Sequence, residues 1–200
     1  MSGFDLVFAF VSLLLGLAIT EVLSGFSRTL AYRRNARDEA RPGWLTPLLG
    51  LFVVLDLTSF WLLAFDFRNQ LQANFLTLFG ILTICGTYYM VATLVFPAEP
   101  GEWRDLDDFY DRQHRLVIGG VLAANLMQIA GQIAVENLIP DPVDSAPMSD
   151  AAAILAGVSG IGILALLIAL LFIARRRLNI AMLMTANLLL LISSSADVLL

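Results

Sequence analysis

The sequence contains no lysine, one histidine and one cysteine, and these absences exclude several classes of protein. All twelve basic residues are arginine, so Schiff-base chemistry, a retinal linkage and a phosphate-loop lysine are excluded. His114 alone cannot supply paired haem ligands. Cys85 has no second cysteine with which to form a disulfide or a cysteine metal site within one chain. We therefore expect no cofactor and no metal.

Charged residues are also scarce, at 14% of the chain, whereas 58% of the residues are hydrophobic and the mean hydropathy is +0.80. A soluble domain is about 45 to 50% apolar and about 25% charged. Beyond the arginines that follow the apolar runs there is no basic surface, so nucleic-acid binding has no support. The composition predicts a membrane protein.

Six apolar segments are each long enough to cross a bilayer, which takes about 20 residues. They cover residues 4–26, 44–66, 73–96, 115–138, 152–174 and 178–200. Continuous runs without period-two alternation favour helices over barrel strands. No positively charged region precedes the first segment, so we interpret it as a retained span and not a signal peptide. The predicted fold is an all-α, polytopic membrane protein: a single domain, residues 1–200, of six transmembrane helices in a compact bundle.

The arginines are distributed unevenly between the two ends of these segments. The connections after the first, third and fifth segments hold eleven of them, and the opposite side holds only Arg68. Positively charged residues concentrate in cytoplasmic loops. This asymmetry predicts a multi-pass protein of the bacterial inner membrane with both termini outside.

Two further patterns concern how the helices pack. The loop lengths and a shared G-x-x-x-x-E-x-L spacing, in residues 16–23 and 131–138, suggest a 3+3 inverted repeat of the kind found in transporters. So short a match also arises by chance in this composition. Small residues at helical spacing, Gly120 with Ala124 and Gly157 with Gly160, allow close helix packing either within the chain or in a dimer.

The segment 102–114 places apolar and acidic residues on opposite faces of a helix. We expect it to form a short helix lying on the membrane. Its aspartates are interpreted as a solvated face, with a divalent-cation site as the alternative.

Polar side chains within the apolar segments are the candidate functional residues, because each ionised group costs about 2.5 to 3.5 kcal/mol at the centre of a membrane helix. At a rise of about 1.5 Å per residue they would form a ladder with steps of roughly 3 to 6 Å. The candidates for an ion or proton path are Asp56, Glu21, Asn125, Gln128, Gln132, Asn187, Asp197 and Glu136.

Asp56 is the central residue of this ladder, since no arginine stands at its depth. Burial without an opposite charge disfavours the ionised form, so we expect Asp56 to be protonated or bound to a cation. It should lie inside the bundle, within reach of Asn125, Gln128 or Asn187. It would then bind helices together, carry an ion, or line a site for a hydrophobic ligand. Glu21 can instead pair with Arg28, seven residues on.

These features predict a transporter-like or channel-like protein that moves protons or a small cation. The alternative is a non-catalytic accessory or structural subunit of a larger membrane complex. We expect no enzyme, because the serines at 193–195 and the possible base His114 lie at opposite ends of the spans. The expected partners are membrane lipid and either further copies of the chain or another membrane subunit.

Overall fold

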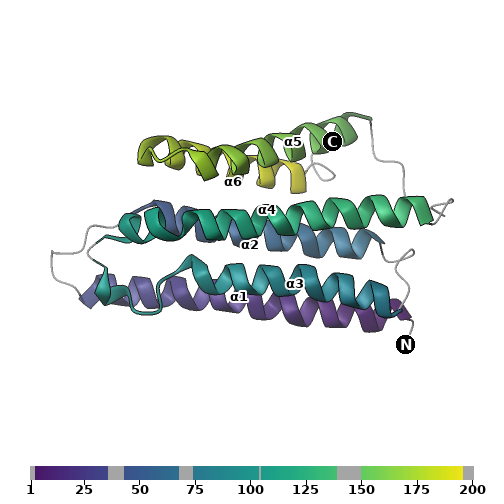
Figure 1. Cartoon of the computed structure of the whole chain (residues 1–200), viewed down its shortest axis with the longest axis horizontal. Helices are drawn as coiled ribbons and strands as arrows, with labels where there is room; N and C mark the ends of the chain where they lie inside the picture. Colours follow the sequence, from purple (N-terminus) through teal and green to yellow (C-terminus); the bar gives the residue numbers. More distant parts are fainter. Residues whose placement is uncertain (1–2, 36–42, 68–73, 104, 139–149, 196–200) are drawn as a thin grey trace.

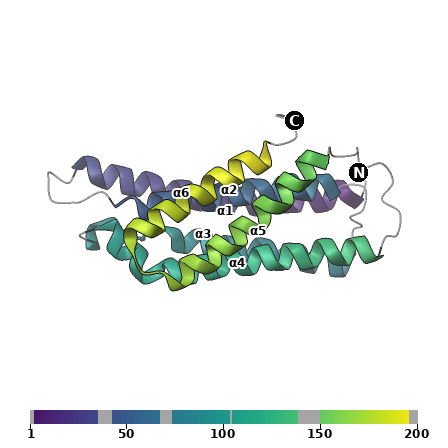
Figure 2. The same cartoon turned by 90° about the horizontal axis from the view of Figure 1, so that it is seen from above.

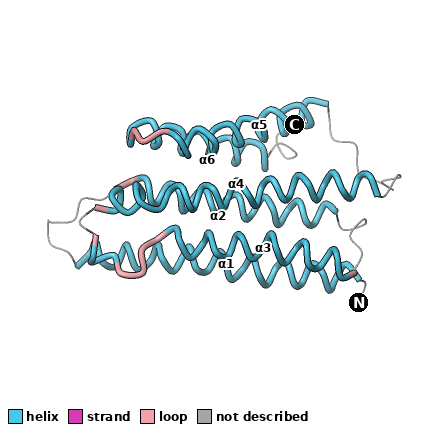
Figure 3. The backbone as a smooth tube through the Cα atoms, viewed as in Figure 1, coloured by secondary structure: helices cyan, strands magenta, loops and turns pink. Residues whose placement is uncertain are grey.

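The computed structural model describes residues 3–35, 43–67, 74–103, 105–138 and 150–195. Within these ranges the chain forms helices and no strand (Figures 1 and 3). The six α-helices are α1 (Gly3–Asn35), α2 (Leu45–Asp66), α3 (Phe75–Val95), α4 (Leu106–Leu138), α5 (Asp150–Phe172) and α6 (Arg176–Ser194), with a 3-10 turn, η2 (Pro100–Glu102), before α4. The prediction of an all-α chain is confirmed.

The helices are arranged in pairs, and each successive helix runs back along the one before it. In Figure 1, α1 and α3 form the lower pair, α2 and α4 the middle pair, and α5 and α6 the upper pair. Figure 2 shows that α5 and α6 run obliquely across the other four helices. The closest packing is between α1 and α3, α3 and α4, and α2 and α6. Residues from α2, α3 and α4 therefore meet in the interior.

Five of the helices are long and apolar enough to cross a membrane, by length and composition. These candidate spans are Asp5–Tyr32, Leu45–Asp66, Phe75–Val95, Leu106–Val135 and Arg176–Ser194. In α5 the described apolar stretch, Gly157–Phe172, is shorter. This pattern is compatible with an integral, multi-pass membrane protein.

The prediction that residues 102–114 form a short helix lying on the membrane is wrong. Helix α4 begins at Leu106 and continues unbroken to Leu138, so this segment is mostly the first turns of α4. Its apolar residues Phe109 and Tyr110 are buried in the protein. The Thr46 hydroxyl donates to the Leu106 carbonyl at 2.9 Å, which ties the start of α4 to the start of α2. The apolar face of this segment is therefore buried against the other helices, and not in the membrane surface as expected.

The small residues divide into two groups. A side chain added at Gly120 would collide with Val91 of α3, and Ala124 is fully buried, so internal packing is confirmed on α4. On α5 the same interpretation is wrong, because Gly157 and Gly160 are exposed and an added Cβ at either position would meet no atom of another described helix within 4 Å.

The two halves of the chain do not pack alike. Helix α1 packs closely along α3, whereas α4 and α6, which would correspond to them in an inverted repeat, are not among the closely packed pairs of the described chain. The packing therefore gives the 3+3 repeat no support.

Candidate functional site

Asp56 occupies the middle of α2 and is 4% exposed. The helix around it is apolar, and its buried face includes Phe52, Val53 and Phe60. Pro47 stands in the first turn, where the helical N–H groups need no partner within the helix. The turns around Asp56 are therefore regular, and its carboxyl group projects into the space shared with α3 and α4.

Two neutral side chains bind the carboxyl group, and a third binds one of them. The Tyr88 hydroxyl donates to Asp56 Oδ2 at 2.8 Å, and Asn125 Nδ2 donates to the same oxygen at 2.9 Å. Gln128 Nε2 in turn donates to the Tyr88 hydroxyl at 2.8 Å. We refer to Asp56, Tyr88, Asn125 and Gln128 as the Asp56 cluster. It joins α2, α3 and α4 and confirms the expected contact with Asn125, while Gln128 acts through Tyr88.

The orientation of the Asn125 amide is determined by a second bond, because its Nδ2 also donates to the Val121 carbonyl at 3.1 Å. Only the N–H side of an amide can donate. Both bonds to Asp56 end on Oδ2, so Oδ1 accepts none from the described residues. No ion pair of the described chain includes Asp56. If the carboxyl group is protonated, Oδ1 is the oxygen that carries the proton, because both donors point at Oδ2.

Tyr88 is the member of the cluster that the candidate path did not include. It is fully buried, whereas the neighbouring Tyr89 is 43% exposed. A buried tyrosine hydroxyl needs a hydrogen-bond partner. Tyr88 follows Cys85 by three residues and precedes Ala92 by four, and both of these are buried. Tyr89 stands four residues after Cys85 and three before Ala92, so this spacing does not distinguish the two tyrosines, and only the packing of α3 does.

Other predicted members lie apart from the cluster. Asn187 of α6 is buried but donates to the Leu48 carbonyl of α2 at 3.2 Å and to Leu183 in its own helix at 2.8 Å. It holds α6 against α2, and the expected contact with Asp56 is not found. Glu21 forms an ion pair with Arg28 at 3.5 Å, as its alternative interpretation predicted, and both side chains are partly exposed.

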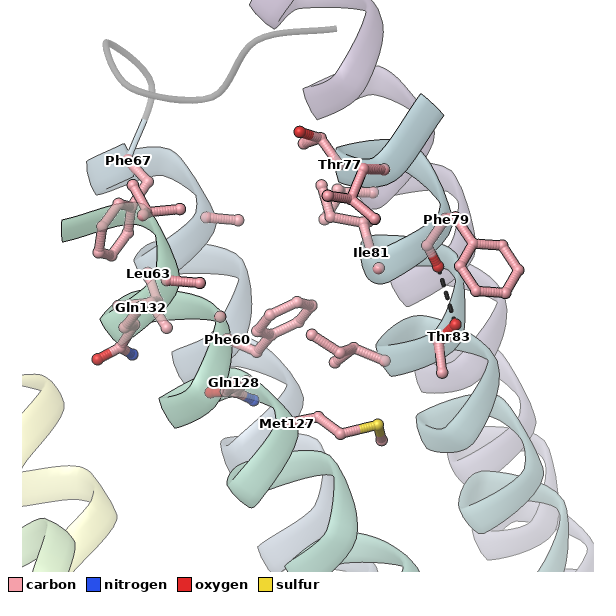
Figure 4. Close-up of a pocket in the computed structure, with 18 residues that line it drawn as sticks. Phe60, Leu63, Phe67, Thr77, Phe79, Ile81, Thr83, Met127, Gln128 and Gln132 are labelled. Atoms are coloured by element: carbon pink, nitrogen blue, oxygen red, sulfur yellow. Dashed lines mark hydrogen bonds between the residues drawn. The ribbon is translucent and has the colours of Figure 1, made fainter. Parts of the chain in front are cut away.

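The remaining candidates do not extend the cluster. Gln132 is half-buried, makes no hydrogen bond to another described residue, and directs its amide away from α3 (Figure 4). The side chain of Glu136 and the whole of Asp197 lie outside the described residues. Over the part of the chain that is described, the predicted polar residues do not form a continuous ladder. They form the compact Asp56 cluster and several separate polar groups.

A cavity of about 450 Å³ adjoins the cluster between α2, α3 and α4. Its walls are almost entirely apolar, with Phe60, Ile81 and Met127 among them. Gln128 belongs to both the cavity wall and the Asp56 cluster. Figure 4 shows Gln128 and Met127 at one end of the cavity and Phe67 and Thr77 at the other. The cavity is lined by the C-terminal parts of α2 and α4 and the N-terminal part of α3. In Figure 1 these parts lie toward the end of the molecule opposite the C-terminal end of α1, which carries Arg28 and Arg34.

The acidic residues at the start of α4 bind an arginine. Arg176 of α6 contacts Asp108 and Asp111 at 2.6 Å and Asp105 at 3.6 Å. The described residues contain no group of three His, Cys, Asp or Glu side chains placed to hold a metal ion. Asp108 and Asp111 remain exposed, as the solvated face predicted from the sequence requires, and they also link α4 to α6 through Arg176.

Comparisons with models of protein families, with curated proteins and with solved structures find no match to this chain.

Proposed function

We propose that the chain is a six-span helical bundle of the bacterial inner membrane, with both termini outside, that moves protons by reversible protonation of Asp56. The observation that carries this proposal is a buried carboxyl group in the middle of α2, held among the described residues only by neutral side chains of α3 and α4. Ionisable groups within membrane spans are commonly part of proton or ion pathways.

A proton suits the Asp56 cluster better than a metal cation. Hard cations bind several oxygen ligands, as the six to eight oxygens around Ca²⁺ illustrate. The groups facing Asp56 Oδ2 are instead an O–H donor from Tyr88 and an N–H donor from Asn125. These donors stabilise either protonation state of a carboxyl group but repel a cation. Of the two cargoes predicted from the sequence, the geometry therefore supports the proton.

Hydrogen bonds extend from Asp56 toward one side of the bundle. Tyr88 accepts from Gln128 and donates to Asp56, so a line of hydrogen bonds joins the carboxyl group to the cavity. Toward the arginine-rich end, the described residues form no such line from Asp56. Because the walls of the cavity are almost entirely apolar, transport requires conformations in which water reaches the cluster first from one side and then from the other, as alternating access demands.

The test is proton uptake by proteoliposomes that contain a pH-sensitive dye, driven by an imposed membrane potential. Wild-type protein should acidify the vesicles faster than protein-free vesicles do. Asp56→Asn should abolish this excess, because the amide retains the hydrogen bonds but cannot exchange a proton. Glu99→Gln is the matched control, since it removes a carboxylate from an exposed residue outside the helices. Equal uptake by Asp56→Asn and wild type, or no excess in wild type, would rule the proposal out.

A second candidate is the accessory subunit, and the exposed glycines of α5 favour it. Gly157 and Gly160 leave open space on the outer face of α5, where another membrane helix could approach closely. The partner would be a second copy of the chain or another membrane subunit. Purified in a mild detergent, wild-type protein should carry that partner in fixed stoichiometry, and Gly157→Leu should lose it. A wild-type particle with the mass of one chain would contradict this function.

A further inference from the structure

The cavity between α2, α3 and α4 has one polar side chain at its inner end, and that side chain has unused hydrogen-bonding capacity. A primary amide offers two N–H donors and one carbonyl acceptor. Within the described chain, Gln128 uses one N–H, which donates to Tyr88. A donor and an acceptor therefore remain on a residue that lines the cavity.

The rim of the cavity is apolar and exposed. Leu76 is 75% exposed and Phe79 is 56% exposed, and the glycines Gly80 and Gly131 are exposed beside them. All four residues line the cavity and belong to the candidate spans of α3 and α4. An opening with such a rim, within helices that cross a membrane, faces lipid. An occupant would enter from the bilayer.

We propose that this cavity binds a neutral, lipid-soluble molecule whose single hydroxyl or carbonyl group pairs with Gln128 while its apolar chain lies between α3 and α4. A volume of about 450 Å³ is within the range of small-molecule sites. The proposal goes beyond proton movement, because it assigns a ligand site that does not depend on the titration of Asp56.

The depth of Gln128 selects this chemistry over an ordinary phospholipid. Through Tyr88, Gln128 is one hydrogen-bonded residue from Asp56, which lies at the middle of α2. A phospholipid keeps its polar groups at the membrane surface, and its chains end in methyl groups that cannot bond to an amide. A charged head group at this depth would carry a large desolvation cost. A neutral head group can leave the membrane surface without that desolvation cost, and its hydroxyl or carbonyl group can bond to the Gln128 amide.

The experiment uses two photoreactive forms of 1-dodecanol with purified protein in phospholipid nanodiscs. One form carries a diazirine beside the hydroxyl group and the other carries it at the far end of the chain. Cross-linked peptides are identified by mass spectrometry. The first form should label Phe60 or Met127 near Gln128, and the second should label the rim around Leu76 and Phe79. Labelling should saturate and should be displaced by 1-dodecanol more effectively than by dodecane.

Two glycines of α4 provide a matched pair of variants. An added Cβ meets no atom within 4 Å at either Gly131, which lines the cavity, or Gly119, which does not. Gly131→Leu should fill the cavity and lower saturable labelling about tenfold, equivalent to about 1.4 kcal/mol of binding free energy. Gly119→Leu should leave it unchanged. Gln128→Leu should retain labelling but remove the preference for the alcohol over the alkane.

Several outcomes would overturn the site. Labelling that spreads over every exposed helix without saturating would overturn it, as would two probes that label the same peptides. Equal losses in the two glycine variants would show that cavity filling is not the cause. Equal displacement by added phospholipid would show that an ordinary lipid chain occupies the space. Since labelling needs no proton gradient, these results are independent of the flux measurement with Asp56→Asn.

Discussion

Asp56 accepts two hydrogen bonds on one oxygen, and both donors come from other helices. When one side chain of such a hydrogen bond is removed and the other stays buried, the remaining polar group has neither its protein partner nor water to bond to. Its uncompensated desolvation costs about 1 to 3 kcal/mol. Asp56 therefore contributes to stability through the groups that it satisfies as well as through its own burial. This contribution can be separated from any role in proton movement.

We expect Asp56→Leu to lower the free energy of unfolding by about 1 to 3 kcal/mol, because it leaves the Tyr88 hydroxyl and the Asn125 amide without their acceptor. Asp56→Asn should stay within about 1 kcal/mol of wild type, since its carbonyl oxygen accepts both bonds. Denaturant unfolding in detergent, followed by tryptophan fluorescence, measures the difference. If the leucine variant is as stable as wild type, the cluster contributes nothing to folding.

The contact between α3 and α4 depends on a glycine. Gly120→Ala should destabilise the protein by about 1 to 3 kcal/mol, because the new methyl group overlaps Val91 of α3 and one helix must move. Gly119→Ala, one residue earlier, should be neutral or should stabilise by up to about 1 kcal/mol, since alanine favours helix and nothing lies near its Cβ. The same unfolding assay compares them. Equal effects would mean that α3 and α4 pack less closely than described.

The first turns of α4 and α6 are linked by Arg176 and its three aspartates. The arginine side chain is 40% exposed, so each pair is worth only about 0.2 to 1 kcal/mol. Arg176→Gln should lower stability by about 1 kcal/mol at low salt, and the loss should shrink as added salt screens the charges. Arg177→Gln is the control, because Arg177 has no ion pair among the described residues. A loss that does not respond to salt would indicate a packing effect.

For the whole molecule, the alternation of helices has a consequence for membrane topology. In Figure 1, α6 runs toward the end of the molecule at which α1 begins. With arginines concentrated after the first, third and fifth segments, that end is predicted to lie outside. Alkaline phosphatase fused after Leu200 should therefore be active, and the same enzyme fused after Arg37 should be inactive. The opposite pattern would reverse the predicted orientation.

The sequence alone determined the helical fold class and the approximate position of each helix, and it singled out Asp56 as a buried carboxyl group. It did not determine every helix end, since α1 continues to Asn35 and α4 begins at Leu106, each nine residues beyond the predicted segment. Apolar run length is a local property, and Leu45–Asp66 and Phe75–Val95 lie within two residues of the predicted segments. The free-energy cost of a carboxyl group in such an apolar run can also be recognised without knowing which residues surround it in the fold. The ion pair between Glu21 and Arg28 was also predictable from the local sequence, because both residues belong to one helix.

Only the tertiary structure decided which polar groups meet. Positions along separate helices give depth, but not the direction in which each helix faces its neighbours. Asn125 and Asn187 were equally plausible partners for Asp56, yet α4 directs one to it while α6 directs the other to the Leu48 carbonyl. Tyr88 joined the cluster because the face of α3 that carries it is turned inward. Rotation of a helix about its axis depends on packing with distant segments, and no local pattern of residues encodes it.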